Sequence, residues 1–158
     1  MSILIKIARR FTPQPYKFVF LQSNPEVTKN LRRDVVTLDL GNNSFLELYW
    51  KSVDLGRGPA VILNVQGYEI MRFDCFGNPG GHFHYQVTEW RRPSEQRMRL
   101  PELTAEDQID RALVELRYTI RWVQDRHPLP RVRNTAHDSL KLHEVTENAR
   151  EIVISYRR

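Results

Sequence analysis

The feature that most constrains this chain is a glycine-rich turn between two segments whose composition is typical of β-strands. The turn is Gly77-Asn-Pro-Gly-Gly81, and this composition favours a reversal of the chain. Residues 68–76 before it are rich in aromatic and β-branched side chains, and residues 82–90 after it alternate between apolar and polar positions. The stretch therefore predicts two antiparallel strands joined by this turn.

A hairpin centred on this turn pairs residues whose numbers add to about 158, which sets Asp74 opposite His84 and Arg72 opposite Gln86. Side chains alternate along a strand, so Arg72, Asp74, His82 and His84 are expected on one face of the sheet. The other face is expected to be apolar. The hairpin thus predicts a concentration of titratable groups on one side of a sheet.

Further strands are predicted before this hairpin. Residues 35–40 and 44–51 flank Gly41-Asn-Asn43, and residues 59–65 lead through Gln66-Gly67 into residues 68–76; both are hairpin signals. Two more alternating segments lie at residues 3–8 and 16–22, and residues 56–59 are expected to break the chain. Short strands at regular spacing predict an antiparallel meander.

One long helix is predicted over residues 104–126. Thr104 is a good N-cap, apolar residues from Ile109 to Val123 recur at helical spacing, and Pro128 follows the end. Residues 91–100 and 128–138 are expected to be loops. Residues 139–158 are ambiguous between a strand and a helical turn, with a terminal strand expected at 151–156.

The predicted fold class is therefore α+β. An antiparallel meander of five to seven strands carries one long amphipathic helix on one face, and residues 1–158 form a single domain. The 158 residues include 41% apolar side chains, with no run close to the ~20 apolar residues that a membrane span needs. We expect no membrane association.

The composition also bears on compartment and partners. The order of apolar and basic residues at the start is wrong for a secretory signal, and the single Cys75 excludes an internal disulfide, so a cytoplasmic location is expected. Cys75 itself is expected to be a small core residue. The net charge of +5 comes from 19 Arg and 5 Lys against 19 acids, which makes a polyanion or an acidic protein a plausible partner.

The titratable face supports two kinds of chemistry. Phosphodiester cleavage needs a base near neutral pH, a proton donor and a cation, and His84 oriented by Asp74, His82 and Arg72 would fill these roles. Alternatively, His82, His84 and Asp74 would form a metal site of two histidines and one carboxylate. No cofactor is expected under the first interpretation.

Residues beside the turn suggest contacts with nucleic acid. Arg91, Arg92, Arg97 and Arg99 follow Trp90, and a mixture of basic and aromatic side chains suits RNA, although a solvated basic loop has the same composition. The three glycines of the turn would let the backbone approach a phosphate, but a plain turn is the preferred explanation of them.

The segment Arg72-Phe-Asp74, the glycine-rich turn, His82-Phe-His84 and a single amphipathic helix together resemble the TumE type of bacterial toxin–antitoxin protein. The resemblance covers about residues 44–126, with Phe73 where that family has Tyr and Cys75 where it has Asn. It implies an RNA-directed protein with an antitoxin partner.

A non-catalytic protein, either an interaction module or a subunit of an assembly, is the other class that the sequence allows. In that case the four polar residues of the hairpin are only a solvated strand end.

Overall fold

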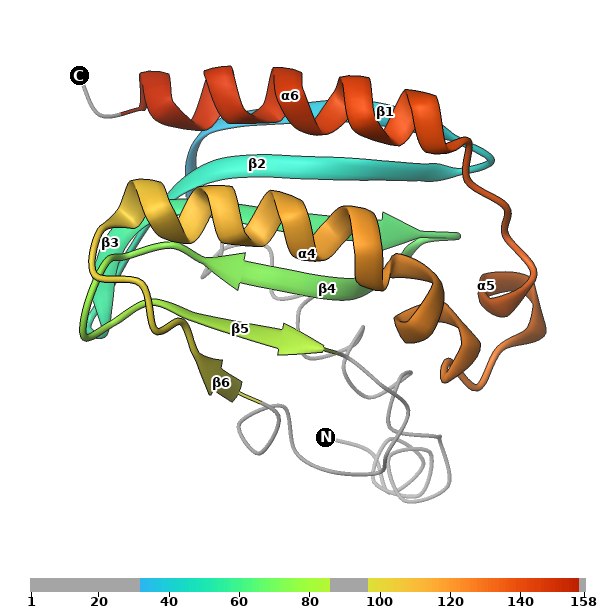
Figure 1. Cartoon of the computed structure of the whole chain (residues 1–158), viewed down its shortest axis with the longest axis horizontal. Helices are drawn as coiled ribbons and strands as arrows, with labels where there is room; N and C mark the ends of the chain where they lie inside the picture. The colour runs from blue at the N-terminus through green and yellow to red at the C-terminus, as the bar shows by residue number, and fades with distance from the viewer. Residues whose placement is uncertain (1–31, 86–96, 157–158) are drawn as a thin grey trace, which may run out of the picture.

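The computed structural model describes residues 32–85 and 97–156, which form one antiparallel sheet and three helices (Figure 1). The predicted strands at residues 3–8 and 16–22, and residues 86–96, lie outside the described residues. The six strands follow one another in chain order across the sheet. They are β1 (Arg32–Gly41), β2 (Ser44–Val53), β3 (Gly56–Val65), β4 (Tyr68–Asp74), β5 (His82–Tyr85) and β6 (Arg97–Arg99).

Two tight turns have the chemistry that the sequence predicts. Asn42 and Asn43, between β1 and β2, have φ angles of 50° and 55°, and Gln66 and Gly67, between β3 and β4, have φ angles of 54° and 80°. Positive φ at both central residues defines the turn whose twist matches that of antiparallel strands. Both predicted hairpins are confirmed.

The helices are α4 (Ala105–Asp125), α5 (Pro130–Arg133) and α6 (Ser139–Ser155). The side chain of Thr104 caps α4 by accepting a hydrogen bond from the backbone N–H of Asp107 at 3.1 Å, and Asp138 caps α6 in the same way. Figure 1 shows α4 and α6 side by side over one face of the sheet. The α+β class and the helix on one sheet face are therefore confirmed.

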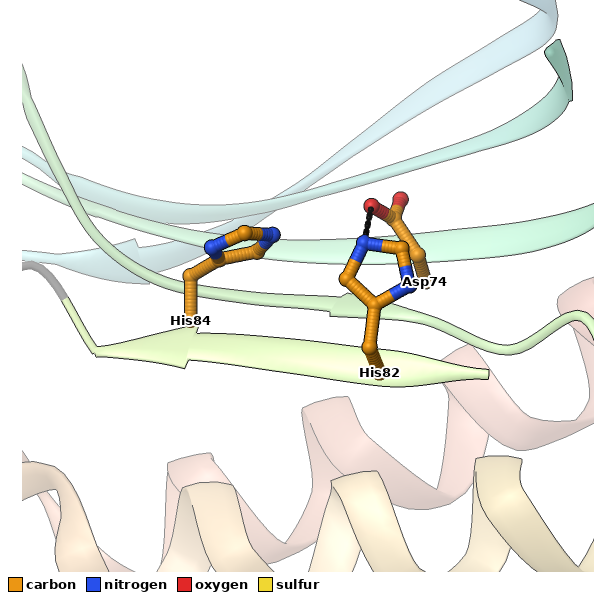
Figure 2. A group of neighbouring side chains, drawn as sticks. All are labelled: Asp74, His82 and His84. Atoms are coloured by element: carbon orange, nitrogen blue, oxygen red, sulfur yellow. Dashed lines mark ion pairs between the residues drawn. The ribbon is translucent and has the colours of Figure 1, made fainter. Parts of the chain in front are cut away.

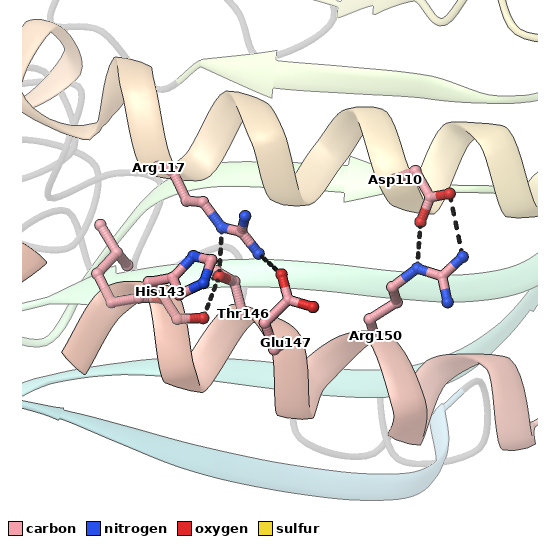
Figure 3. Close-up of polar contacts among 7 residues, drawn as sticks. Asp110, Arg117, His143, Thr146, Glu147 and Arg150 are labelled. Carbon is pink, nitrogen blue, oxygen red and sulfur yellow. Dashed lines mark hydrogen bonds and ion pairs between the residues drawn. The ribbon is translucent and has the colours of Figure 1, made fainter. Parts of the chain in front are cut away.

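Polar contacts join α6 to α4. Arg117 of α4 donates from Nε to the Thr146 hydroxyl at 2.6 Å and also pairs with Glu147, while Arg150 of α6 pairs with Asp110 of α4 at 2.6 Å (Figure 3). One arginine reaches from α4 to α6 and the other from α6 to α4. Together these contacts hold the two helices in position relative to each other.

The main core lies between the sheet and these two helices. It is one continuous cluster of buried apolar side chains from the helix-facing side of the strands and the inner stripes of the helices. Prominent members are Leu46, Leu48, Val61, Leu63, Met71, Phe73, Cys75, Ile109, Leu113, Leu116, Ile120, Leu142, Ala149 and Val153. Cys75 is a buried core residue, as predicted.

The terminal segment differs from the prediction. The strand expected at residues 151–156 is wrong, because residues 139–155 form the single helix α6. Its buried positions are Leu142, Thr146, Ala149 and Val153, which recur every three or four residues. Two of these four positions are small or polar, so the apolar stripe is faint in the sequence.

Three loop predictions also need correction. The break expected at residues 56–59 is instead the start of β3, which pairs with the end of β2 through Gly56 and Val53. Residues 97–99, expected to be a loop, pair with β5 as the edge strand β6. The expected loop at residues 128–138 contains α5, which begins at Pro130, a residue favoured in a first helical turn.

The helix assignment predicts a contrast between two residues of α4. Leu116 is 0% exposed and Val114 is 46% exposed. We expect Leu116→Ala to lower the free energy of unfolding by ~2–5 kcal/mol, because it removes buried methyl groups and leaves a cavity. Val114→Ala is the matched control and should change stability by less than ~1 kcal/mol. Urea denaturation measures both, and equal losses would contradict the orientation of α4.

A buried histidine follows the end of α4. His127 accepts a hydrogen bond from the backbone N–H of Leu129 at its Nδ1 atom, at 3.2 Å. Burial, followed by the positive charges of Arg133 and Arg131, lowers the pKa of His127 to about 4. The folded protein therefore favours the neutral ring more strongly than the unfolded chain does.

This shift predicts a pH dependence of stability. The contribution of His127 is fully present above the unfolded pKa of ~6.5 and is lost as the pH falls from there through about 4. We expect His127→Gln to flatten the loss of stability between about pH 7.5 and pH 4.5. Urea denaturation across this range is the measurement. The exposed His143 provides the control variant His143→Gln, which should keep the wild-type slope.

Candidate functional site

The candidate site lies on β4 and β5, on the sheet face turned away from α4 and α6. Figure 2 shows the side chains of Asp74, His82 and His84 rising from this face, opposite the helices. The pairing register places Asp74 across from His82 and Arg72 across from His84. The predicted partners, His84 for Asp74 and Gln86 for Arg72, are therefore wrong.

The error has a physical reason that leaves the predicted face intact. Every observed pair adds to 156, two less than the expected sum. A shift of two residues preserves the alternation of side chains, so all four predicted residues still share one face. The shift changes which histidine meets the carboxylate, so the role predicted for each histidine changes with it.

Asp74 is the centre of the site. Its Oδ2 atom accepts a hydrogen bond from Nζ of Lys51 at 2.8 Å and lies 3.1 Å from Nε2 of His82 (Figure 2 shows the second contact). Its other oxygen, Oδ1, is buried and has no hydrogen-bond partner. The side chain is almost fully buried, at 1% exposure.

Lys51 is the member of this cluster that the sequence did not predict. It lies on β2, and its side chain reaches Asp74 on β4, past the intervening β3. The β3 residues in register with the pair are small, because Lys51 lies opposite Gly58 and Asp74 opposite Ala60. The signal in the sequence is a lone lysine on the polar side of β2 together with two small residues on the next strand.

The surroundings of Asp74 favour its ionised form. Burial alone would raise the pKa of the Asp74 carboxyl, but the hydrogen bond from His82 and the charges of Lys51 and Arg72 outweigh it and hold this pKa well below its usual range. Burial lowers the pKa of Lys51, although the negative charge of Asp74 opposes this effect. Burial raises the pKa of the neighbouring Tyr49 to about 12, so its hydroxyl stays protonated.

The two histidines have different surroundings. Nδ1 of His82 lies 2.8 Å from the carbonyl oxygen of Gly80, and since a carbonyl only accepts, Nδ1 carries the hydrogen. Both ring nitrogens of His82 are therefore engaged, one with Gly80 and one with Asp74. His84 is half-buried, and its ring centroid lies 5.0 Å from that of His82. Asp74 orients His82, not His84 as predicted.

Arg72 lies beside these histidines with one donor unused. Its NH2 group pairs with Glu69 at 2.7 Å, while its Nε–H group is buried without a hydrogen-bond partner. Burial by itself would lower the pKa of Arg72, but the charge of Glu69 more than compensates, so the guanidinium stays charged. A buried, charged group with an unused donor is costly, and an anionic oxygen would satisfy it.

The glycines of the turn serve the fold. A Cβ atom at Gly80 would lie 2.3 Å from the carbonyl oxygen of Leu55, and one at Gly81 would lie 2.0 Å from the Gln108 side chain. Gln108 in turn accepts a hydrogen bond from the backbone N–H of Gly77 at 2.9 Å. The packing of the turn therefore requires glycine at positions 80 and 81, because protein atoms occupy the space that a side chain would need.

Two of the predicted nucleic-acid-binding residues lie next to the site. Arg97 is in register with His84, and Arg99 with His82, across the β5–β6 pair. Both arginines are exposed at the edge of the sheet. Within residues 32–85 and 97–156, neither forms an ion pair. Arg91 and Arg92 lie outside the described residues.

A comparison of the chain with protein-family models, with curated proteins and with solved structures finds no significant match. Among the described residues, no helix combines the length and the apolar character that crossing a membrane requires. The function must therefore be inferred from the site itself.

Two Lys–Asp pairs with the same separation allow a test of the buried site. Lys51–Asp74 and Lys141–Asp39 are both 2.8 Å apart, but the side chains of the first pair are 17% and 1% exposed and those of the second 41% and 76%. We expect Lys51→Met to lower the free energy of unfolding by about 2 kcal/mol. This is less than the ~3–5 kcal/mol typical of breaking a buried pair, because Asp74 keeps His82.

The exposed pair is the control. Lys141→Met should cost less than ~1 kcal/mol, because water screens the Lys141–Asp39 attraction. Urea denaturation of the two variants at neutral pH measures the difference. Equal and small losses would contradict a structural role for the contact between Lys51 and Asp74.

Proposed function

We propose that this protein acts on RNA, or on another phosphodiester, by acid–base chemistry at Arg72, Asp74, His82 and His84. The observation that carries the proposal is the buried Nε–H group of Arg72, which has no hydrogen-bond partner and belongs to a residue in register with His84. A phosphate oxygen placed there would satisfy this donor, and it would lie beside the imidazole of His84, the side-chain type that most often transfers protons in catalysis.

The reaction follows from the chemistry of RNA. His84 takes the proton of the ribose 2′-hydroxyl, and the 2′ oxygen then attacks phosphorus. The bond from phosphorus to the 5′ oxygen breaks, and His82 gives its Nε2 proton to that leaving oxygen. The products are a 2′,3′-cyclic phosphate and a free 5′-hydroxyl. Before this transfer Asp74 accepts from the same Nε2–H group at 3.1 Å, and after it the contact between Nδ1 and the Gly80 carbonyl keeps the ring in place.

Cations around the histidines support a negatively charged substrate. Charge accumulates on the phosphate oxygens as the 2′ oxygen attacks, and fixed cations stabilise that charge. Arg72 of β4 and Arg97 of β6 are both in register with His84, and the exposed Arg99 extends the positive charge along the sheet edge. The edge arginines would contact the phosphates on either side of the one that is cleaved.

The partner in this proposal is RNA, and the TumE-like motif adds an antitoxin protein as a second partner. The support is the motif of Arg72, Asp74, His82 and His84 around the turn, whose residues lie on one face of two paired strands. A toxin-like role within a bacterial cell is the biological form of the proposal.

An interaction module is the second candidate, and a different surface favours it. Val114, Tyr118 and Trp122 lie at intervals of four residues on α4, and all three are exposed. An exposed apolar stripe at this spacing suits contact with another protein. A pure interaction module would bind through this stripe and would leave RNA intact.

Cleavage of a labelled oligoribonucleotide by the full chain tests the proposal. We expect His84→Gln to lower kcat by about 10²–10⁴-fold, the usual contribution of a group that transfers a proton. His143→Gln, in the exposed histidine of α6, should keep wild-type activity. The matching deoxyribonucleotide, which lacks the 2′-hydroxyl, should not be cleaved.

Two outcomes would contradict the proposal. One is the absence of a 2′,3′-cyclic phosphate product in the presence of folded wild-type protein. The other is equal activity of the His84→Gln and His143→Gln variants, which would place the reaction elsewhere. Circular dichroism of each variant shows that the fold is retained.

A further inference from the structure

We propose that Asp74, His82 and His84 also form a binding site for a divalent first-row transition metal ion such as Zn²⁺ or Fe²⁺. This inference goes beyond the proposed function, because metal binding requires no nucleic acid. It rests on the positions of the ligand atoms, on the contact that orients one histidine, and on an unused carboxylate oxygen.

The three side chains offer one ligand atom each, and these atoms all lie within 4.8 Å of one another. Figure 2 shows the three side chains gathered on one face of β4 and β5. His82 and His84 are two residues apart on one strand, so both point the same way, and Asp74 is held opposite by the strand pairing. Two imidazole nitrogens and one carboxylate oxygen suit zinc or iron, whereas magnesium and calcium prefer oxygen ligands alone.

The contact between His82 and Gly80 is the one that metal-binding histidines usually make. A histidine that binds a metal through one nitrogen commonly donates its other N–H to a carbonyl or carboxylate. Nδ1 of His82 lies 2.8 Å from the Gly80 carbonyl oxygen, which leaves Nε2 directed at the site. Nε2 is 3.1 Å from Oδ2 of Asp74, close to the roughly 3.3 Å between two ligands of a tetrahedral zinc ion with bonds of ~2.0–2.1 Å.

Asp74 supplies the independent indication of a ligand. Its Oδ1 atom is buried and has no hydrogen-bond partner, and the residue as a whole is 0% exposed. An unpaired carboxylate oxygen in a buried position is costly, and a cation beside it would remove that cost. A single ion also needs much less space than a nucleotide, which fits a carboxylate this deeply placed.

Lys51 is the competitor for this site. Its ammonium group lies 2.8 Å from Oδ2 of Asp74, so a metal ion that binds Asp74 must approach against this positive charge or displace it. The flexible four-carbon stem of lysine allows such a displacement. Cys75 is not a fourth ligand, because its side chain belongs to the buried core on the helix side of the sheet.

The metal and the acid–base reaction exclude each other, because both use the same histidine nitrogens. If the proposed function is correct, we therefore expect a bound metal ion to inhibit RNA cleavage. Metal binding itself can be measured without RNA, so the failure of one proposal is distinguishable from the failure of the other.

Titration calorimetry of the full, untagged chain with Zn²⁺ alone tests the site, and Co²⁺ provides a second probe through its visible absorption. We expect one ion per chain. His84→Gln should weaken binding by more than the roughly 10–100-fold that loss of an outer contact typically costs, because it removes a direct ligand. His143→Gln should bind as the wild type does. Lys51→Met should bind more tightly, because the competing charge is gone.

Three results would overturn the proposal. The first is no saturable binding of either ion to the folded wild-type protein. The second is equal affinity of the His84→Gln and His143→Gln variants, which would place the ion elsewhere. The third is unchanged or weaker binding by Lys51→Met, since an ion bound to Asp74 must compete with Lys51. His84 is half-buried, so its variant is expected to fold, and circular dichroism checks this.

Discussion

The burial of one carboxylate, that of Asp74, is the constraint on which the organisation of the site depends. An ionised carboxylate removed from water must be paired and hydrogen-bonded, or it destabilises the fold. Here Lys51 and His82 both contact one of its oxygens, at 2.8 Å and 3.1 Å. These contacts explain why residues from β2, β4 and β5 converge, and why the residues of β3 in register with them are Gly58 and Ala60.

The turn before β5 is a second consequence of this arrangement. The turn between β4 and β5 brings His82 opposite Asp74, and this turn packs against the rest of the protein on two sides. Gly80 lies against the backbone of Leu55, and Gly81 lies against Gln108 at the start of α4. The glycines thus position His82 through packing, and they affect the chemistry of the site only indirectly.

The sequence predicts the sheet and its polar face because both depend on local patterns. Side chains alternate along β4 and β5, so Asp74 and His82 lie on the same face whenever the numbers of paired residues add to an even sum. The register itself was wrong by two residues, because the length of a glycine-rich turn does not determine how its ends pair. Lys51 was missed because its partner is two strands away, and no local pattern records a contact of 23 residues' separation. The helix α6 was missed because Thr146 and Ala149 occupy half of its buried stripe.

The distribution of charge separates the two ligands that this face would attract. Arg32 pairs with Glu47, Arg72 with Glu69, and Lys51 with Asp74, so the charges in the middle of the sheet largely balance one another. Arg97 and Arg99 lie on β6, and among residues 32–85 and 97–156 no acid forms an ion pair with them, so this strand carries two uncompensated positive charges. Under the proposed function a polyanion would be attracted first to β6, where Arg97 lies in register with His84 of β5. The proposed metal ion would bind deeper in the sheet, at Asp74, against the positive charge of Lys51. The positive charge of Lys51 would therefore favour binding of the anion and oppose binding of the cation.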